Sequence, residues 1–101
     1  MKIKVIFRKF PTGEVIALFP ELPGTNSART CLNYMSIGQH GTGKATCEGT
    51  KPIAINDIEG QNNVNFLCRE LRSIGYTLTI VSRFTHKMYK ERVRKLRGMT
   101  K

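Results

Sequence analysis

The clearest chemical signature in this sequence is the segment Gly38 to Lys44, which reads G-x-x-x-x-G-K. In a P-loop this spacing turns backbone N–H groups toward phosphate, and the lysine reaches the outer phosphate groups. Ala45 stands where a P-loop has the Ser or Thr that binds magnesium, and Gly49 and Pro52 prevent the helix that must follow. We therefore predict a loop that contacts phosphate without hydrolysing nucleotides. Its candidate contact residues are Gln39, His40, Gly41, Gly43 and Lys44.

His40 in this segment is also a candidate general base of a nuclease or phosphodiesterase, with Lys44 holding a phosphate. Such a centre needs a second acid–base group. The loop carboxylates have no spacing that pairs them with this histidine; they are Glu21, Glu48, Asp57 and Glu59. A histidine flanked by glycines is more often a turn or hydrogen-bonding residue than a catalyst. We assign no catalytic residue and keep His40-dependent hydrolysis as the less favoured hypothesis.

The cysteines do not form a metal-binding or disulfide pattern. Cys31, Cys47 and Cys68 are odd in number and have no C-x-x-C spacing. No two of these cysteines and the two histidines are near neighbours in sequence, as ligands of structural zinc usually are. The sequence therefore predicts no metal and no cofactor.

Several short segments carry a longer resemblance. They are Glu14 to Glu21 (E-V-I-A-L-F-P-E), Cys31 to Tyr34, Gly38 to Gly41 (G-Q-H-G), Thr50 to Pro52 and Leu71 to Tyr76 (L-R-S-I-G-Y). Together they resemble a family of small uncharacterised proteins of bacteria, phages and other mobile elements. That family has a V-I-A-L-F-P-E strand, a Y-x-x-x-G-Q-H-G box and an L-x-x-I-G-Y helix end. The resemblance implies a phage or mobile-element protein and brings no established activity. This chain departs from the family pattern at Ile55 to Asn63 and beyond Val81.

Length and composition limit the class of protein. The chain has 101 residues, of which 40% are hydrophobic, as expected for one globular domain with a modest core. No apolar run approaches the roughly 18 residues that a membrane span requires, and the N-terminus is unlike a signal peptide. We therefore expect a single cytoplasmic domain that does not enter membranes.

Hydrophobic periodicity predicts an α+β domain with a small antiparallel sheet in β-β-β-α-β-α order. Apolar residues alternate with basic ones near the N-terminus, which is typical of a half-buried strand, and Pro20 is expected to end the second strand. A short strand is also a candidate at Ile53 to Ile55. The predicted main elements are a hairpin from Lys2 to Pro20, a strand from Arg29 to Ile37, a helix from Asn63 to Ile74, a strand from Tyr76 to Arg83 and a basic helix from Thr85 to Arg97.

The first predicted helix has an apolar stripe at i, i+3, i+4 and i+7. It is formed by Val64, Leu67, Cys68 and Leu71. Asn62 or Asn63 is the expected N-cap, and Gly75 is the expected residue just past the C-cap. Cys68 on this stripe is interpreted as a small core residue and not as a reactive thiol.

Positive charge is concentrated in the last part of the chain. From Arg83 to Lys101 there are eight basic residues and one acid, so this segment carries +7 of the net +10. We expect the helix to be anchored by Tyr89, Val93 and Leu96, and Thr85 to cap it. Within an arc of about 80° on the same helix lie four cations, Lys87, Lys90, Arg94 and Arg97.

Such a cationic face is suited to the phosphate backbone of DNA or RNA. The candidate contacts are Lys87, Lys90, Arg92, Arg94, Lys95 and Arg97, and the N-terminal Lys2, Lys4, Arg8 and Lys9 extend the surface if the helix packs beside them. Candidates for base stacking are Tyr34, Phe84 and Tyr89. No recognition helix, RNP box or zinc finger is present, so sequence-specific readout is not predicted.

The positive charge of the basic helix also fits a different class of function. A small inhibitor or adaptor carried by a mobile element needs only a folded surface, and a basic helix can dock on an acidic groove of a host protein. We favour a non-enzymatic nucleic-acid-binding accessory protein and keep the adaptor as the alternative.

Overall fold

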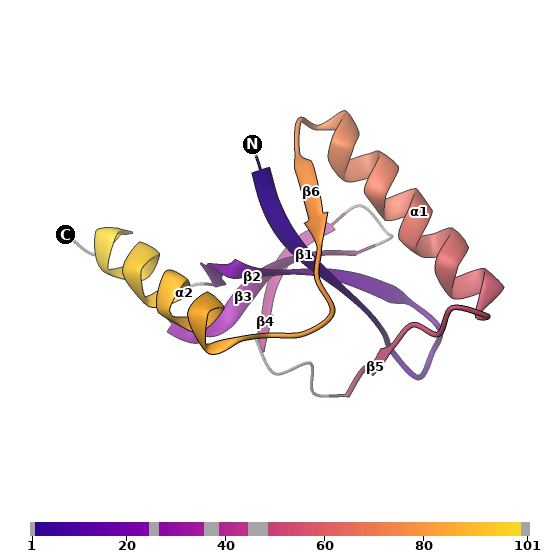
Figure 1. Cartoon of the computed structure of the whole chain (residues 1–101), viewed down its shortest axis with the longest axis horizontal. Coiled ribbons are helices and arrows are strands. Elements are labelled where there is room, and N and C mark those ends of the chain that lie inside the picture. The colour runs from indigo at the N-terminus through magenta and orange to yellow at the C-terminus, as the bar shows by residue number, and fades with distance from the viewer. Residues whose placement is uncertain (1, 25–26, 36–38, 45–48, 100–101) are drawn as a thin grey trace.

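A computed structural model describes residues 2–24, 27–35, 39–44 and 49–99 of the chain. Eight helices and strands follow one another in these ranges (Figure 1). In chain order they are β1 (Lys2–Lys9), β2 (Val15–Gly24), β3 (Ser27–Met35), β4 (Gln39–Lys44), β5 (Lys51–Pro52), α1 (Ile58–Ser73), β6 (Thr77–Ile80) and α2 (His86–Met99).

The strands form one sheet in the order β4-β3-β2-β1-β5, and β6 also pairs with β1. All neighbours are antiparallel except β6, which runs parallel to β1 with Lys2 opposite Thr77 and Val5 opposite Ile80. Helix α1 carries the chain from β5, beside the end of β1, back to the start of β1, and β6 then runs in the same direction as β1 (Figure 1). The predicted α+β class and the β-β-β-α-β-α order are confirmed, with β4 and β5 as additional strands.

Several predicted strand boundaries are wrong. The strand predicted from Tyr76 to Arg83 is Thr77–Ile80, and the strand predicted from Arg29 to Ile37 is Ser27–Met35. The segment from Gln39 to Lys44 is an edge strand and not a loop, because it continues the β3 hairpin in antiparallel register. The short strand lies at Lys51–Pro52 beside the end of β1, and residues 53–55 are outside it. Pro20 does not end β2; the strand continues to Gly24 through register shifts after Phe19, where a bulge or irregularity lets the chain bend.

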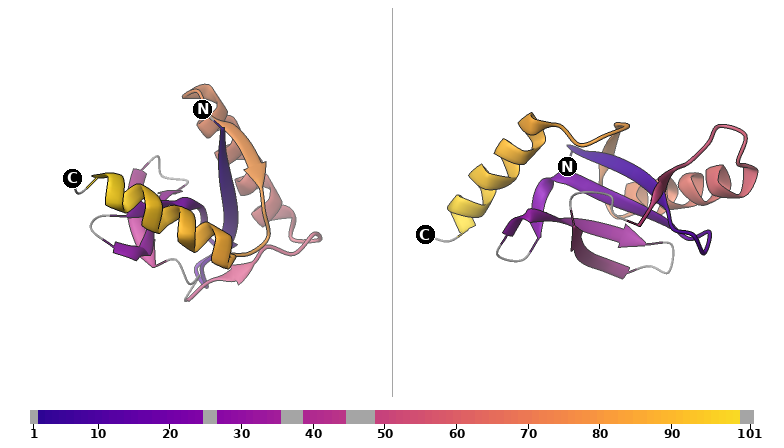
Figure 2. Two further views of the ribbon diagram at one scale, coloured as in Figure 1. Left: turned by 60° about the vertical axis from the view of Figure 1, so that its left-hand side comes forward. Right: turned by 90° about the horizontal axis from the view of Figure 1, so that it is seen from below.

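The sheet has an apolar cluster on each face because buried side chains alternate along the strands. The first cluster contains Val5, Ala17 and Phe19 of the sheet and is covered by Leu67 and Leu71 of α1. The second contains Ile6, Ile16, Leu18 and Cys31, with Val81 and Phe84 packed against it. Helix α1 covers the first cluster, whereas α2 packs against β2 and β3 at the other end of the molecule (Figures 1 and 2).

Helix α1 begins five residues before the predicted start at Asn63. Asp57 is the N-cap, and its Oδ1 accepts a hydrogen bond from the Gly60 N–H at 2.9 Å. Its other oxygen pairs with the Lys9 ammonium of β1, which ties the helix start to the sheet. The predicted N-cap at Asn62 or Asn63 is therefore wrong, because the helix has an additional turn before the apolar stripe.

The C-terminal end of α1 follows the prediction. The Gly75 N–H donates to the Arg72 carbonyl and the Tyr76 N–H to the Leu71 carbonyl, both at 3.1 Å. This is the Schellman pattern, and Gly75 has the required positive φ of 105°. The predicted stripe is also confirmed, since Leu67, Cys68 and Leu71 are buried. Burial raises the pKa of the Cys68 thiol, as expected for a core cysteine.

The Asp57 carboxylate predicts a pH dependence of stability. Its pKa is lowered, first by the hydrogen bond from Lys9 and then by the Gly60 N–H. A lowered pKa in the folded state means that stabilisation is complete above the ordinary aspartate pKa of about 4 and is lost as the pH falls below it.

Asp57→Asn keeps a capping oxygen and removes the charge. We expect chemical denaturation to show that the parent is more stable than this variant at pH 6, with the difference shrinking toward pH 2. Glu59→Gln, in the same helical turn, is the control, and an equal loss in both variants would contradict the prediction.

Candidate nucleic-acid interface

The basic helix is fixed at its start by a side-chain cap. The Thr85 hydroxyl accepts a hydrogen bond from the Met88 N–H at 3.3 Å, and the Thr85 carbonyl accepts from the Tyr89 N–H at 3.2 Å. This confirms Thr85 as the predicted N-cap of α2. The helix then runs to Met99, two residues beyond its predicted end.

The buried face of α2 differs from the predicted stripe of Tyr89, Val93 and Leu96. Met88 and Arg92 are the buried residues of this helix, whereas Tyr89 is 42% exposed. Val93 and Leu96 are half-buried and lie at the edges of the buried face of α2. The helix is thus rotated relative to the expectation, because the contact with β2 and β3 is made through the long side chain of Arg92.

Arg92 holds α2 against the ends of two strands. It is only 4% exposed, its Nε donates to the Ala28 carbonyl at 2.8 Å, and its second nitrogen donates to the Pro20 carbonyl. The guanidinium also lies 5.6 Å from the ring centroids of Phe84 and of Tyr89. Burial lowers the pKa of Arg92, although a guanidinium stays charged in proteins. The prediction that Arg92 is an exposed nucleic-acid contact is therefore corrected: this residue anchors the helix.

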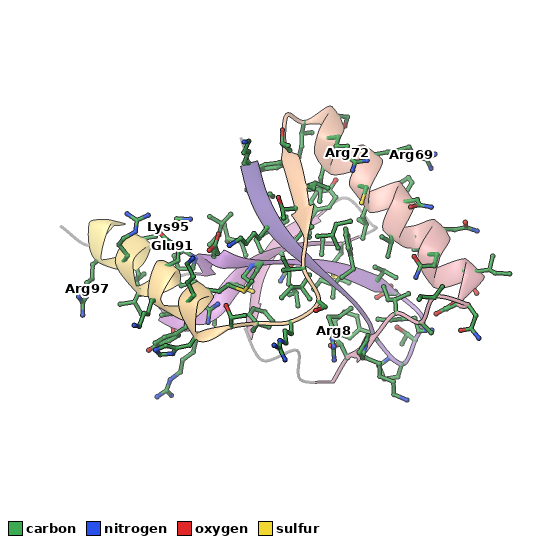
Figure 3. All side chains as sticks on the ribbon, viewed as in Figure 1. Arg8, Arg69, Arg72, Glu91, Lys95 and Arg97 are labelled. Carbon is green, nitrogen blue, oxygen red and sulfur yellow. The ribbon has the colours of Figure 1, made fainter. Side chains whose placement is uncertain are left out.

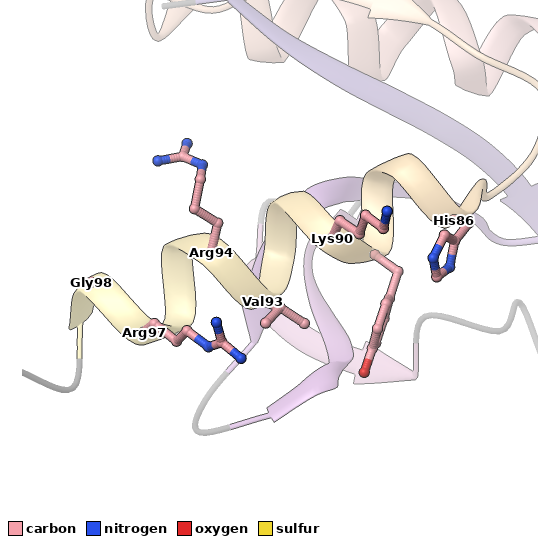
Figure 4. Close-up of a pocket in the computed structure, with 7 residues that line it drawn as sticks. His86, Lys90, Val93, Arg94, Arg97 and Gly98 are labelled. Atoms are coloured by element: carbon pink, nitrogen blue, oxygen red, sulfur yellow. The ribbon is translucent and has the colours of Figure 1, made fainter.

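A groove lies on the outward side of α2 (Figure 4). Its volume is about 850 Å³, and it is lined by His86, Tyr89, Lys90, Val93, Arg94, Arg97 and Gly98. These residues recur every three or four positions and cover about half of the helix circumference. The structure therefore brings together three of the predicted cations, Lys90, Arg94 and Arg97, and none of the lining side chains is acidic.

The remaining predicted cations lie elsewhere. Lys87 is exposed but does not line the groove, and Lys95 is half-buried toward the sheet. Lys95 lines a cavity of about 30 Å³ with Lys2, Lys4 and Glu21 of β1 and β2. In Figure 3 Lys95 and Arg97 point to different sides of α2. Lys95 therefore does not line the groove, although the sequence placed it among the candidate nucleic-acid contacts.

The N-terminal cations extend the basic surface only in part. Lys4 forms an ion pair with Glu21 at 3.3 Å. Arg8 donates to the Thr50 hydroxyl and carbonyl at 3.1 and 3.0 Å, and Lys9 pairs with Asp57. These side chains have partners in the protein itself, so we leave them out of the candidate interface.

Two aromatic side chains lie at the N-terminal end of the groove. The rings of His86 and Tyr89 are nearly parallel, with centroids 6.0 Å apart and an interplanar angle of 22°. Of the three predicted stacking candidates, Tyr89 is exposed, Tyr34 is buried in the first cluster, and half-buried Phe84 packs on the second. Burial and then the Glu70 carboxylate raise the pKa of Tyr34, consistent with a core position. The sequence analysis missed His86, although its i, i+3 spacing to Tyr89 indicates contact.

The predicted phosphate-contact segment has a different backbone from a P-loop. In β4, His40 is opposite Tyr34, Gly43 opposite Cys31 and Lys44 opposite Thr30. Successive N–H groups of an antiparallel strand point in opposite directions, so they do not converge on one anion. The side chains of residues 39–44 lie outside the described part of the structure, as do Gly38, Ala45 and Cys47. A phosphate contact at Gln39, His40, Gly41, Gly43 and Lys44 stays a prediction.

One carboxylate lies beside the groove. Glu91 accepts a hydrogen bond from Arg94 Nε at 2.6 Å and pairs with the same guanidinium a second time. Arg94 lowers the pKa of Glu91, and the charges of Lys95 and Lys4 act in the same direction. Because Glu91 neutralises part of the charge of Arg94, the ion pair weakens the cationic character of the groove.

We therefore expect Glu91→Gln to bind nucleic acid about two- to fivefold more tightly, the range that an exposed ion pair allows. The measurement is fluorescence anisotropy with a labelled oligonucleotide at low salt. Glu59→Gln on α1 removes the same charge far from the groove and is the control. Equal gains in the two variants would indicate a general charge effect and contradict a role for the ion pair.

Within the described residues, no group of three or more His, Cys, Asp or Glu side chains is placed to hold a metal ion. None of the described helices has the length and apolar character needed to cross a bilayer. In comparisons with known proteins, no family model, no curated protein and no solved structure matches this chain.

Proposed function

We propose that this chain is a small non-enzymatic accessory protein that binds nucleic acid through helix α2, without strong sequence specificity. The observation that carries the proposal is the groove on α2, which is lined by Lys90, Arg94 and Arg97 together with the exposed ring of Tyr89. Cations at this spacing can each neutralise a phosphate, and the aromatic ring offers a surface for a base.

Charge repulsion within α2 also favours a polyanionic partner. The described residues of α2 carry six lysine and arginine side chains, including buried Arg92, and one acid. Like charges at this density oppose one another, and a polyanion relieves that repulsion. A membrane surface fits less well, since the groove lining offers only Tyr89 and Val93 as large apolar bulk.

The groove chemistry favours contact with the backbone over reading of base edges. Bidentate recognition of adenine uses Asn or Gln, and neither lines the groove. Arginine can pair with the edge of guanine, but of the two groove arginines Arg94 is already paired with Glu91. Lysine and arginine at the ends of long side chains adapt to phosphates at varied positions. We therefore expect affinity to vary little with base sequence.

The experiment is a salt titration of the purified protein with labelled single-stranded and duplex DNA and RNA of mixed sequence. If three groove cations contact phosphate, log K should fall against log salt with a slope of about −2 for single strands and about −2.7 for duplexes. Binding that is absent at 20 mM salt, or that is independent of salt, would overturn the proposal.

The alternative is an adaptor whose basic helix docks on an acidic host protein. A pull-down from a cell extract, with and without nuclease treatment, separates the two proposals. Partners that disappear after nuclease treatment support nucleic-acid binding. A single partner that persists, together with a flat salt titration, would favour the adaptor.

A further inference from the structure

We infer that the groove on α2 takes single-stranded nucleic acid in preference to a duplex, with the His86–Tyr89 pair as a platform for an unstacked base. This inference rests on the proposed function and names the ligand of the same site. It depends on three features of the described residues: the exposure of Tyr89, the support behind its ring and the position of the groove cations.

Tyr89 presents an unusually large apolar surface for a residue on a charged helix. It is 42% exposed, although the neighbouring position Met88 is buried. His86 lies one turn earlier with its ring nearly parallel to that of Tyr89. The two rings therefore form a two-membered stack on the same helix face as the groove cations.

The ring of Tyr89 is supported from behind. The Arg92 guanidinium lies 5.6 Å from its centroid and is itself held by the carbonyls of Pro20 and Ala28. Phe84 contacts the same guanidinium. This arrangement restricts the Tyr89 ring before a ligand arrives, so little conformational entropy is lost when a base stacks on the His86–Tyr89 pair.

The groove cations continue from this platform along the helix. Lys90 follows Tyr89 directly, and Arg97 lies two turns further, about 11 Å away by helical rise. Figure 4 shows Arg94 and Arg97 pointing to different sides of the helix. A strand whose base lies on the platform can thus place its phosphates between these side chains.

A duplex cannot use this arrangement fully. Its bases are stacked on one another and turn only their edges toward the grooves, whereas an aromatic platform contacts the face of a base. The α2 groove has no side-chain amide with which to read adenine edges. Charge alone attracts both forms, so the aromatic pair provides the preference for a single strand.

The test compares a labelled 20-nucleotide oligo(dT) with a 20-base-pair duplex at the same salt concentration. We expect the full chain to bind the single strand at least tenfold more tightly. Tyr89→Leu keeps apolar bulk but removes the aromatic face, and it should weaken single-strand binding about tenfold. Its salt slope and its affinity for the duplex should be unchanged, and Tyr89→Phe should behave as the parent.

The chain has no tryptophan, so Tyr89→Trp provides a fluorescent reporter at this position alone. Quenching of its emission by oligo(dT), and not by the duplex, is the expected result, and it does not depend on how well Tyr89→Leu folds. Equal affinity for both forms, or absence of quenching while oligo(dT) binds, would overturn this inference and leave general nucleic-acid binding intact. Absence of binding to either form would overturn both proposals.

Discussion

Replacing Lys90, Arg94 and Arg97 together by glutamine is expected to lower nucleic-acid affinity about 100-fold at 0.1 M salt. Each lost phosphate contact removes about 0.7 from the salt slope for a single strand, so the slope should flatten by about 2. The fold should be retained, because all three residues line the outward groove and the anchor residues Met88 and Arg92 are untouched. A salt titration by fluorescence anisotropy, together with a thermal melt, measures both effects.

A matched control removes the same charge elsewhere. Lys51, Arg69 and Arg72 are exposed residues of β5 and α1, and Figure 3 shows the two arginines at the far end of the molecule from α2. Their triple glutamine variant should keep most of the parent's slope. An equal loss in both triple variants would mean that net charge, and not the groove, determines binding, and the candidate interface would then be wrong.

The second large effect is expected at Arg92. Arg92→Ala should destabilise the domain by about 3 to 5 kcal/mol, because a buried carbonyl and a partly buried one lose a charged donor and a buried side chain is removed. A domain of this size has a total stability of about 5 to 15 kcal/mol. The melting temperature should therefore fall by about 15 °C or more, as measured by circular dichroism.

Arg94→Ala, two residues along the same helix, is the control for Arg92. Arg94 is exposed and pairs with Glu91 on the same helix, so its loss should change stability by no more than about 0.5 kcal/mol. Arg92→Lys keeps the charge but cannot reproduce two directed donors, and it should fall between the two alanine variants. Similar melting temperatures for Arg92→Ala and Arg94→Ala would show that Arg92 does not anchor α2.

The Arg92 variants and the triple glutamine variant separate anchoring from binding within one helix. Arg92 and Arg94 have similar sequence surroundings, and both are basic residues of α2. The expected outcomes differ: loss of Arg92 lowers stability, whereas loss of Arg94 with Lys90 and Arg97 lowers affinity. If the platform is held by Arg92, folded Arg92→Lys protein should also bind single strands less tightly than the parent.

Local patterns in the sequence determined much of the fold. The alternation around Ile3 and Val5, the stripe of Leu67, Cys68 and Leu71, the Gly75 helix end and the Thr85 cap all appear as expected. These features depend on neighbours within a few residues, where backbone geometry and burial of one face control the outcome. The concentration of cations in α2 is likewise a property of composition.

Long-range contacts decided the rest. The rotation of α2 depends on Arg92 reaching the carbonyls of Pro20 and Ala28, which lie 72 and 64 residues away in sequence. The start of α1 depends on the pairing of Asp57 with Lys9, and the segment Gln39–Lys44 became a strand because β3 offers a partner. A sequence alone determines which residues are charged or apolar; only the tertiary structure decides which of them meet. Here that difference made Arg92 an anchor and left Tyr89 exposed, because a helix packs through whichever side chains find partners on the surface beneath it.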